Sequence, residues 1–279
     1  MTPLRRIWQR HVVEVWEDAE AESAAARAAA PPGRLDIEMT VVVVSALLTM
    51  IALRYYGLPS RAHWFVDAVD LLGLDGVSNR LDHALFESAQ REFNGQVFWA
   101  VFRIIVYSAA PLIIGRWVLR RSPARLGWNT TGWRDHLGVY LVLFALMMPL
   151  VVAASFDAAF REQYPFYAPP EGESLWPRFW IWEGLYLGQF VALEWFFRGF
   201  LVHGLKDRVG AMSVLVMLGP YVAIHLTKPA PEAVGSIVAG LVLGALSLRS
   251  GMVLWGALLH FGVAISIDLL VLAHDGRVF

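Results

Sequence analysis

The chain has 279 residues, of which 57% are hydrophobic and 17% are charged, and its formal net charge is −1. Soluble domains are about 45–50% apolar and about 25% charged, so the composition argues against an ordinary soluble domain. A net charge near zero gives no support for nucleic acid as a partner. The absence of cysteine excludes disulfides, thiolate metal sites and a cysteine nucleophile.

Residues 1–35 predict an N-terminal cytoplasmic helix. From Leu4 to Trp16, apolar residues recur at helical spacing beside arginines, which is typical of a helix lying on a membrane surface. An ordinary solvated helix is an equal alternative. Pro31–Pro32–Gly33 should end this segment. We expect no cleaved signal peptide, because no short basic stretch runs directly into an apolar core and a small-residue cleavage site.

The remaining residues, 36–279, predict one transmembrane domain. Its long apolar runs indicate about seven membrane spans in an all-α, polytopic helical bundle. The expected spans are 37–54, 96–117, 137–156, 179–203, 211–227, 233–248 and 252–273. Several barely reach the length needed to cross about 30 Å of hydrocarbon, so one short run is compatible with a re-entrant segment. Residues 57–95 predict one or two helices at an interface.

Loop charges predict the orientation of the bundle. Segment 116–135 carries five arginines and one acidic residue, segment 57–95 carries three arginines and six acidic residues, and segment 157–178 carries two arginines and four acidic residues. Basic loops stay in the cytoplasm. We therefore expect a multi-pass membrane protein with its N-terminus and segment 116–135 in the cytoplasm.

Glu194 and Arg198 stand out inside the fourth expected span, because a spacing of four places both side chains on one helix face. Charged groups are costly in a bilayer, which makes the pair a candidate functional site. The alternative is an internal salt bridge that only locks the helix. His225 and His260 follow on later apolar runs, and a count of 1.5 Å per residue puts Glu194 about 18 Å and His260 about 15 Å deep.

The chemistry of such a group would be coherent. A buried glutamate beside a histidine can take a proton from water, a second histidine can donate to the developing oxyanion, and an arginine can orient the carboxylate. Glu194, His225 and His260 also match a catalytic zinc ligand set, so a divalent metal stays an open alternative. We assign no other cofactor.

These residues resemble the motifs of the CPBP family of intramembrane proteases, which includes the type II CAAX prenyl endopeptidase and bacteriocin-processing and immunity relatives. The family pattern is E-E-x-x-x-R, then F-x-x-x-H, then H-x-x-x-N or D. Here Glu194 and Arg198 match the first motif, Tyr221 and His225 the second, and His260 the third. The resemblance covers about residues 100–273, with the motif core at about 179–273.

The resemblance implies an intramembrane endopeptidase of a bacterial inner membrane, acting on a peptide or membrane protein among lipids. Glu194 would then be the base or its support, Arg198 its orienter, His225 a partner in water activation and His260 the oxyanion donor. A non-catalytic membrane scaffold or immunity protein is the alternative, and a transporter comes third.

Two positions depart from the family pattern. Leu193 stands where the family has its first glutamate, usually assigned as the water activator, and Ala264 stands where it has asparagine. Three alternatives follow: Glu194 has taken over as the base, another residue supplies the base, or the protein does not cleave peptides. Glu232 is the nearest substitute, although a loop salt bridge with Lys228 is the favoured interpretation.

Asp268 would replace the missing asparagine only if its helix bends, because it lies eight residues after His260. We expect His203 to be a surface group.

Overall fold

The computed structural model describes residue 5 and residues 9–277. Within these residues the chain is helical, and its one β-type pairing is an isolated bridge between Trp128 and Met252. The long helices are α3 (Arg34–Tyr56), α6 (Arg91–Trp117), α7 (Trp133–Ala154), α9 (Arg178–Glu194) with its π-helical continuation η5 (Trp195–His203), α12 (Ala230–Ser250) and α13 (Leu254–His274). The predicted all-α polytopic bundle is confirmed.

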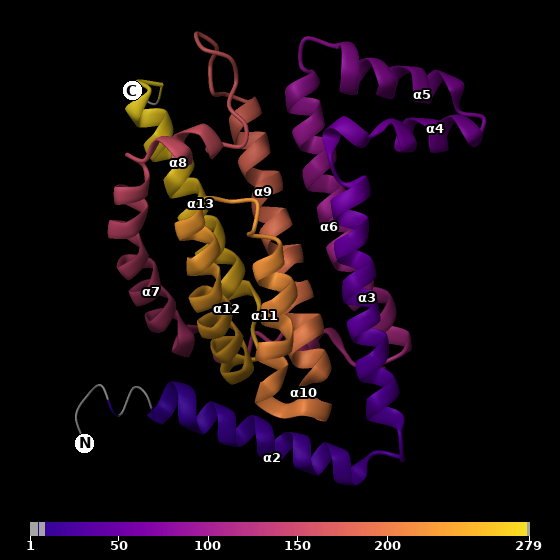
Figure 1. Ribbon diagram of the computed structural model, residues 1–279, viewed down its shortest axis with the longest axis vertical. Coiled ribbons are helices and arrows are strands. Elements are labelled where there is room, and N and C mark those ends of the chain that lie inside the picture. Colours follow the sequence, from indigo (N-terminus) through magenta and orange to yellow (C-terminus); the bar gives the residue numbers. More distant parts are fainter. Residues whose placement is uncertain (1–4, 6–8, 278–279) are drawn as a thin grey trace.

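Shorter elements connect the long helices. They are η1 (Gln9–Val13), α2 (Glu14–Ala29), η2 (Pro59–Arg61), α4 (His63–Leu71), α5 (Asp75–Asp82), η3 (His83–Glu87), η4 (Pro123–Leu126), α8 (Ala158–Gln163), α10 (Gly204–Val209), η6 (Gly210–Met212) and α11 (Ser213–Ala223). The interfacial helices expected in segment 57–95 are α4 and α5, which project from one end of the bundle (Figure 1).

Within the described residues, six helical runs are long and apolar enough to cross a membrane, against about seven predicted spans, and the fourth run, Arg178–Ala223, includes α11. The exception is 211–227, where α11 has only 11 residues. At 1.5 Å per residue it extends about 16 Å, roughly half of a hydrocarbon core. Its apolar side chains Val214, Met217 and Tyr221 are buried. Contact with η5 and α12, rather than with lipid, thus accounts for much of its hydrophobicity.

Helix α2 lies across the end of the bundle opposite α4 and α5 (Figure 1). Val15, Ala19 and Ser23 recur every four residues and are buried, so one face of α2 packs on α10 and η6. The Ser23 hydroxyl donates to the carbonyl of Asp207 at 3.2 Å. The predicted N-terminal helix therefore covers the end of the protein. Its residues Leu4, Ile7 and Trp8 lie outside the described residues.

Glycines on α12 let α11 approach closely. A Cβ atom on Gly244 would lie 2.6 Å from Cγ1 of Val214, and one on Gly240 would lie 2.5 Å from Cδ1 of Leu218. Both distances are too short for a side chain, so these positions require glycine unless a neighbour moves. The contact between α11 and α12 thus depends on small residues spaced four apart.

The ends of the bundle differ in loop charge, which generates a prediction of sidedness. Segments 116–135 and 157–178 lie at opposite ends (Figure 1). A cysteine-reactive, membrane-impermeant reagent should label Thr130→Cys only from the cytoplasmic side and Gly172→Cys only from the exterior, since the unsubstituted chain has no cysteine. Labelling of both variants from the same side would contradict this topology.

Candidate functional site between α9, α11 and α13

The buried ion pair between Glu194 and Arg198 forms the centre of the site. Arg198 donates from Nη1 to Oε1 of Glu194 at 2.7 Å, and their side chains are 0% and 1% exposed. The pair stands at the junction where α9 becomes the π-helix η5, and all nine residues of η5 are buried. Single π-helical turns widen a helix locally and are frequent at functional sites.

Helix α13 reaches this pair through a glycine. A Cβ atom on Gly256 would lie 2.5 Å from Oε2 of Glu194, so a side chain there would displace the carboxylate. One turn later, Nδ1 of His260 lies 2.9 Å from Oε1 of Glu194. The structure therefore brings together Glu194, Arg198 and His260 from helices far apart in the sequence.

Tyr221 on α11 completes the group, although the sequence marked it only as a motif position. Its hydroxyl lies 3.0 Å from Nε2 of His260. The Arg198 guanidinium carbon stands 4.2 Å above the centre of the Tyr221 ring, a cation–π contact. Arg198, Glu194, His260 and Tyr221 thus form one continuous polar chain, which we call the central polar chain.

His225 stands beside this chain. It lies in the turn after α11, with its Nδ1 2.8 Å from the backbone carbonyl oxygen of Tyr221. The two rings are 4.8 Å apart between centroids. Burial lowers the pKa of His225, which favours the neutral imidazole. His225 contacts Tyr221 rather than the carboxylate, so it can position Tyr221.

Glu232 belongs to a different cluster. Tyr164 donates its hydroxyl proton to Glu232 at 2.8 Å, and Lys228 donates to the Tyr164 oxygen at 2.7 Å. Lys228 and Glu232 are 3.7 Å apart at their charged atoms. Burial lowers the pKa of Lys228 to about 8, while Glu232 and Asp268 raise it. This arrangement agrees with the loop salt bridge favoured by the sequence and leaves Glu232 apart from His260.

Two carboxyl groups form a second buried feature. Glu183 on α9 and Asp268 on α13 are 2% and 0% exposed, and none of their carboxyl oxygens has a hydrogen-bond donor among the described residues. The two groups interact with each other. Glu183 was missed, although its spacing of 11 residues, about three turns, places it on the same face of α9 as Glu194. Along the helices the pair lies about 12–16 Å from the central polar chain.

Ala264 and His203 also differ from their expected surroundings. Ala264 packs with Trp182 and Tyr186 in an apolar cluster, so no polar group there takes the place of the family's asparagine. His203 is 5% exposed, with Nε2 3.0 Å from the hydroxyl oxygen of Ser247. The expectation of a surface histidine is wrong, because η5 is buried on all sides and α12 covers this residue.

The residues proposed as zinc ligands do not fit a metal in this arrangement. Arg198 occupies Oε1 of Glu194, and a guanidinium at that distance opposes a second cation. His225 faces a backbone carbonyl. Within the described residues, no three His, Asp or Glu side chains converge as a metal-ligand group. We therefore derive no chemistry through a metal.

Burial of the ion pair predicts a large effect of Arg198→Ala. Removing the guanidinium leaves the Glu194 carboxylate buried and unpaired, which typically costs about 3–5 kcal/mol of folding free energy. A strongly lowered melting temperature in detergent is expected. The matched control is Arg161→Ala, whose pair with Asp275 is 46% and 39% exposed and should contribute less than about 1 kcal/mol. Equal melting temperatures for the two variants would contradict the buried pair.

The Glu183–Asp268 pair predicts the opposite effect for Asp268→Asn. An amide in place of the Asp268 carboxyl group cannot ionise and supplies a permanent N–H donor to Glu183. Stabilisation by about 1 kcal/mol is expected, since an unsatisfied buried polar group typically costs about 1–3 kcal/mol. Thermal unfolding in detergent measures it. A lower melting temperature for Asp268→Asn would show that the carboxyl pair has partners beyond those described.

Comparison with known proteins agrees with the motif order. Residues 175–266 match the family model described as Rce1-like, type II CAAX prenyl endopeptidase. The searches of curated proteins and of solved structures gave no match. The matched segment runs from the start of α9 to the middle of α13 and contains the whole central polar chain. Residues 175–266 are therefore similar to the Rce1-like family, and the resemblance to the CPBP family that the motifs predict is confirmed.

Proposed function

We propose that this CAAX-protease-like membrane protein is an intramembrane endopeptidase whose general base is His260. The observation that supports the proposal is the position of its imidazole, with one ring nitrogen 2.9 Å from the Glu194 carboxylate and the other 3.0 Å from the Tyr221 hydroxyl. A histidine held between a carboxylate and a hydroxyl is a recurring arrangement for general-base catalysis.

In this proposal Glu194 orients the base instead of acting as one. Its Oε1 already accepts a charge-assisted hydrogen bond from Arg198, which stabilises the ionised carboxylate and reduces its tendency to take a proton. Glu194 would instead favour the imidazole tautomer with its proton on Nδ1 and would stabilise the imidazolium. The roles expected from the family pattern, Glu194 as base and His260 as oxyanion donor, are thus exchanged for ones that the geometry favours.

The reaction would proceed by direct attack of water. The water oxygen bonds to the carbonyl carbon of the peptide while its proton passes to Nε2 of His260. The Tyr221 hydroxyl, once turned from His260, donates to the developing oxyanion. The imidazolium then gives its proton to the leaving amine nitrogen as the peptide bond breaks. Arg198 holds Glu194 throughout, and His225 positions Tyr221. The name of the matched family supports a peptide presented at the membrane as the substrate.

A non-catalytic scaffold is the second candidate, favoured by Leu193. This side chain is 6% exposed and packs with Phe196 and Phe197 in the largest apolar cluster. At the position where the family pattern has a glutamate, this chain thus has a leucine whose side chain is packed in an apolar cluster. The ion pair would then serve structure alone.

Cleavage of a quenched fluorescent peptide carrying a prenylated C-terminal Cys-a-a-X sequence, by protein reconstituted in lipid, tests the proposal. His260→Ala should lose about 10²–10⁴-fold in rate, the typical contribution of a general base. Tyr221→Phe should lose about 10²–10³-fold, as expected for one oxyanion donor. Glu232→Gln is the control and should keep wild-type activity, because Glu232 lies in the separate Tyr164 cluster.

Two outcomes would decide against the proposal. Full activity of His260→Ala would remove His260 as base. If the wild type cleaves nothing while Leu193→Glu gains cleavage, the protein is a scaffold that has lost the family's water activator.

A further inference from the structure

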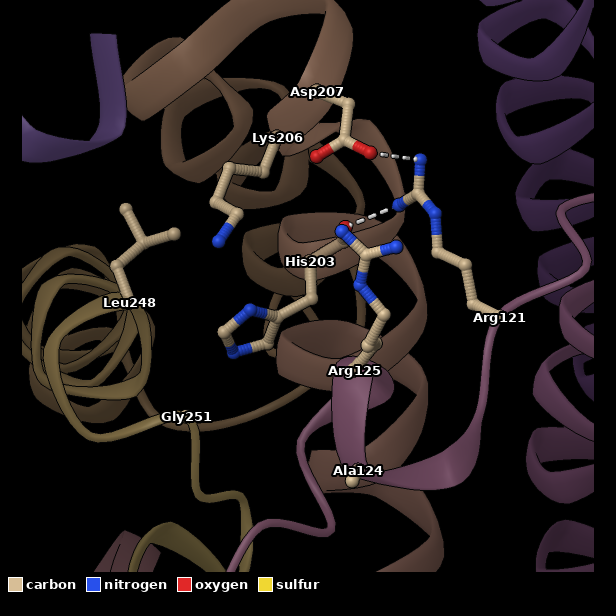
Figure 2. A pocket seen from close by; sticks show the side chains of 8 residues that line it. All are labelled: Arg121, Ala124, Arg125, His203, Lys206, Asp207, Leu248 and Gly251. Carbon is tan, nitrogen blue, oxygen red and sulfur yellow. Dashed lines mark hydrogen bonds and ion pairs between the residues drawn. The ribbon is translucent and has the colours of Figure 1, made fainter. Parts of the chain in front are cut away.

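A small cavity lies at the end of the bundle covered by α2, where His203, five residues after Arg198 on η5, forms part of its lining. Its volume is about 130 Å³. It opens between η4, the start of α10 and the C-terminal end of α12 (Figure 2). Cationic side chains dominate its polar lining: Arg121, Arg125 and Lys206, together with His203 and Asp207.

Arg121 forms a fixed wall of the cavity. It donates to the carbonyl oxygens of His203 and Gly204 at 2.6 and 3.0 Å, and it lies 2.9 Å from Asp207 and 3.5 Å from Glu38. Burial lowers the pKa of Arg121, and Asp207 and Glu38 raise it again. Asp207 and Glu38 thus balance the charge of Arg121. Arg121 therefore holds the wall of the cavity in place and is not the group that would bind an anion.

Arg125 differs, because no carboxylate pairs with it in the described part of the chain. Its guanidinium is close enough to Arg121 for the two like charges to repel, which lowers the pKa of Arg121 further. Figure 2 shows Arg125 of η4 and Lys206 of α10 among the side chains that line the cavity. An anion bound beside Arg125 would offset the repulsion between Arg125 and Arg121.

Lys206 is available to such an anion. Its ammonium pairs with Glu22 of α2 at 2.5 Å, but the Glu22 side chain is 60% exposed. The Lys206 side chain is 21% exposed, and an ion pair open to solvent on one side contributes little, about 1 kcal/mol, so the flexible lysine can turn from Glu22 to an anion in the cavity. A guanidinium fork and an ammonium on opposite sides are a typical set for a phosphate group.

The position of the cavity indicates the source of the phosphate. Its walls are the ends of spanning helices, followed by the short elements that leave the membrane, and Trp117 ends α6 nearby. This is the depth of the lipid headgroups, and basic sites at that depth between helices attract anionic lipids. We propose that the cavity binds the phosphate of an anionic lipid headgroup in the leaflet on the α2 side. This site is independent of peptide cleavage.

The test measures thermal unfolding of the purified full-length chain with added phosphatidylglycerol, phosphatidylcholine or soluble glycerol phosphate. Phosphatidylglycerol should raise the melting temperature of the wild type, because a ligand of the folded state stabilises it, and phosphatidylcholine should not. Arg125→Gln should weaken the apparent affinity for phosphatidylglycerol at least about tenfold, as expected for loss of a charge-assisted hydrogen bond.

The matched control is Arg116→Gln, which removes an exposed arginine of the same end of the bundle that does not line the cavity. It should respond to phosphatidylglycerol as the wild type does. Ala124→Glu, which places a negative charge on the cavity wall, is a second variant that should abolish the response.

Equal responses of Arg125→Gln and Arg116→Gln, or no response of the wild type, would overturn the site. Glycerol phosphate could also raise the melting temperature as much as phosphatidylglycerol does at the same concentration, with both effects lost in Arg125→Gln. That result would show that the cavity binds free phosphate compounds and would overturn the lipid headgroup as the ligand.

Discussion

The buried ion pair between Glu194 and Arg198 constrains the middle of this bundle, because both charged groups are removed from water. Each ion would cost several kcal/mol if buried alone, so the helices around Glu194 and Arg198 must supply what water otherwise would. The arginine lies over the electron-rich face of Tyr221, and α13 has a glycine where the carboxylate needs space. The contacts of the central polar chain therefore replace the water that Glu194 and Arg198 lose on burial, whether or not the chain takes part in catalysis.

Sequence reasoning succeeded where one helix determines the answer. The four-residue spacing of Glu194 and Arg198 fixes their mutual position on any helix, and the long apolar runs locate six of the seven predicted spans on long helices. At 211–227 the helix is shorter than predicted, because hydropathy does not distinguish a face that contacts lipid from one that contacts η5 and α12. Relations between helices depend on tilt, rotation and turn length. For that reason neither the separation of Glu232 from His260 nor the closeness of Tyr221 to His260 was predictable.

The same helices hold polar groups at two levels. Glu194 on α9 faces His260 on α13, and about three turns away Glu183 on α9 faces Asp268 on α13. The first level is neutralised by an arginine and linked by short contacts, whereas the second lacks donors. The two carboxylate sites occupy equivalent positions on the same pair of helices, but only the Glu194 site has a cation that neutralises its charge. Leu193 packs among aromatic rings beside the first level.

The shortness of α11 has a consequence for the backbone at its end. The chain leaves the helical state at Ile224 and resumes it at Ala230, and the amides and carbonyls of such a turn cannot face hydrocarbon without partners. Tyr164, from the connection before α9, already meets Lys228 and Glu232 there. The turn meets part of this need itself, because the amides of His225, Leu226 and Lys228 donate to nearby backbone carbonyls. The short α11 therefore ends in a polar, internally bonded turn beside Tyr221 instead of continuing as a spanning helix.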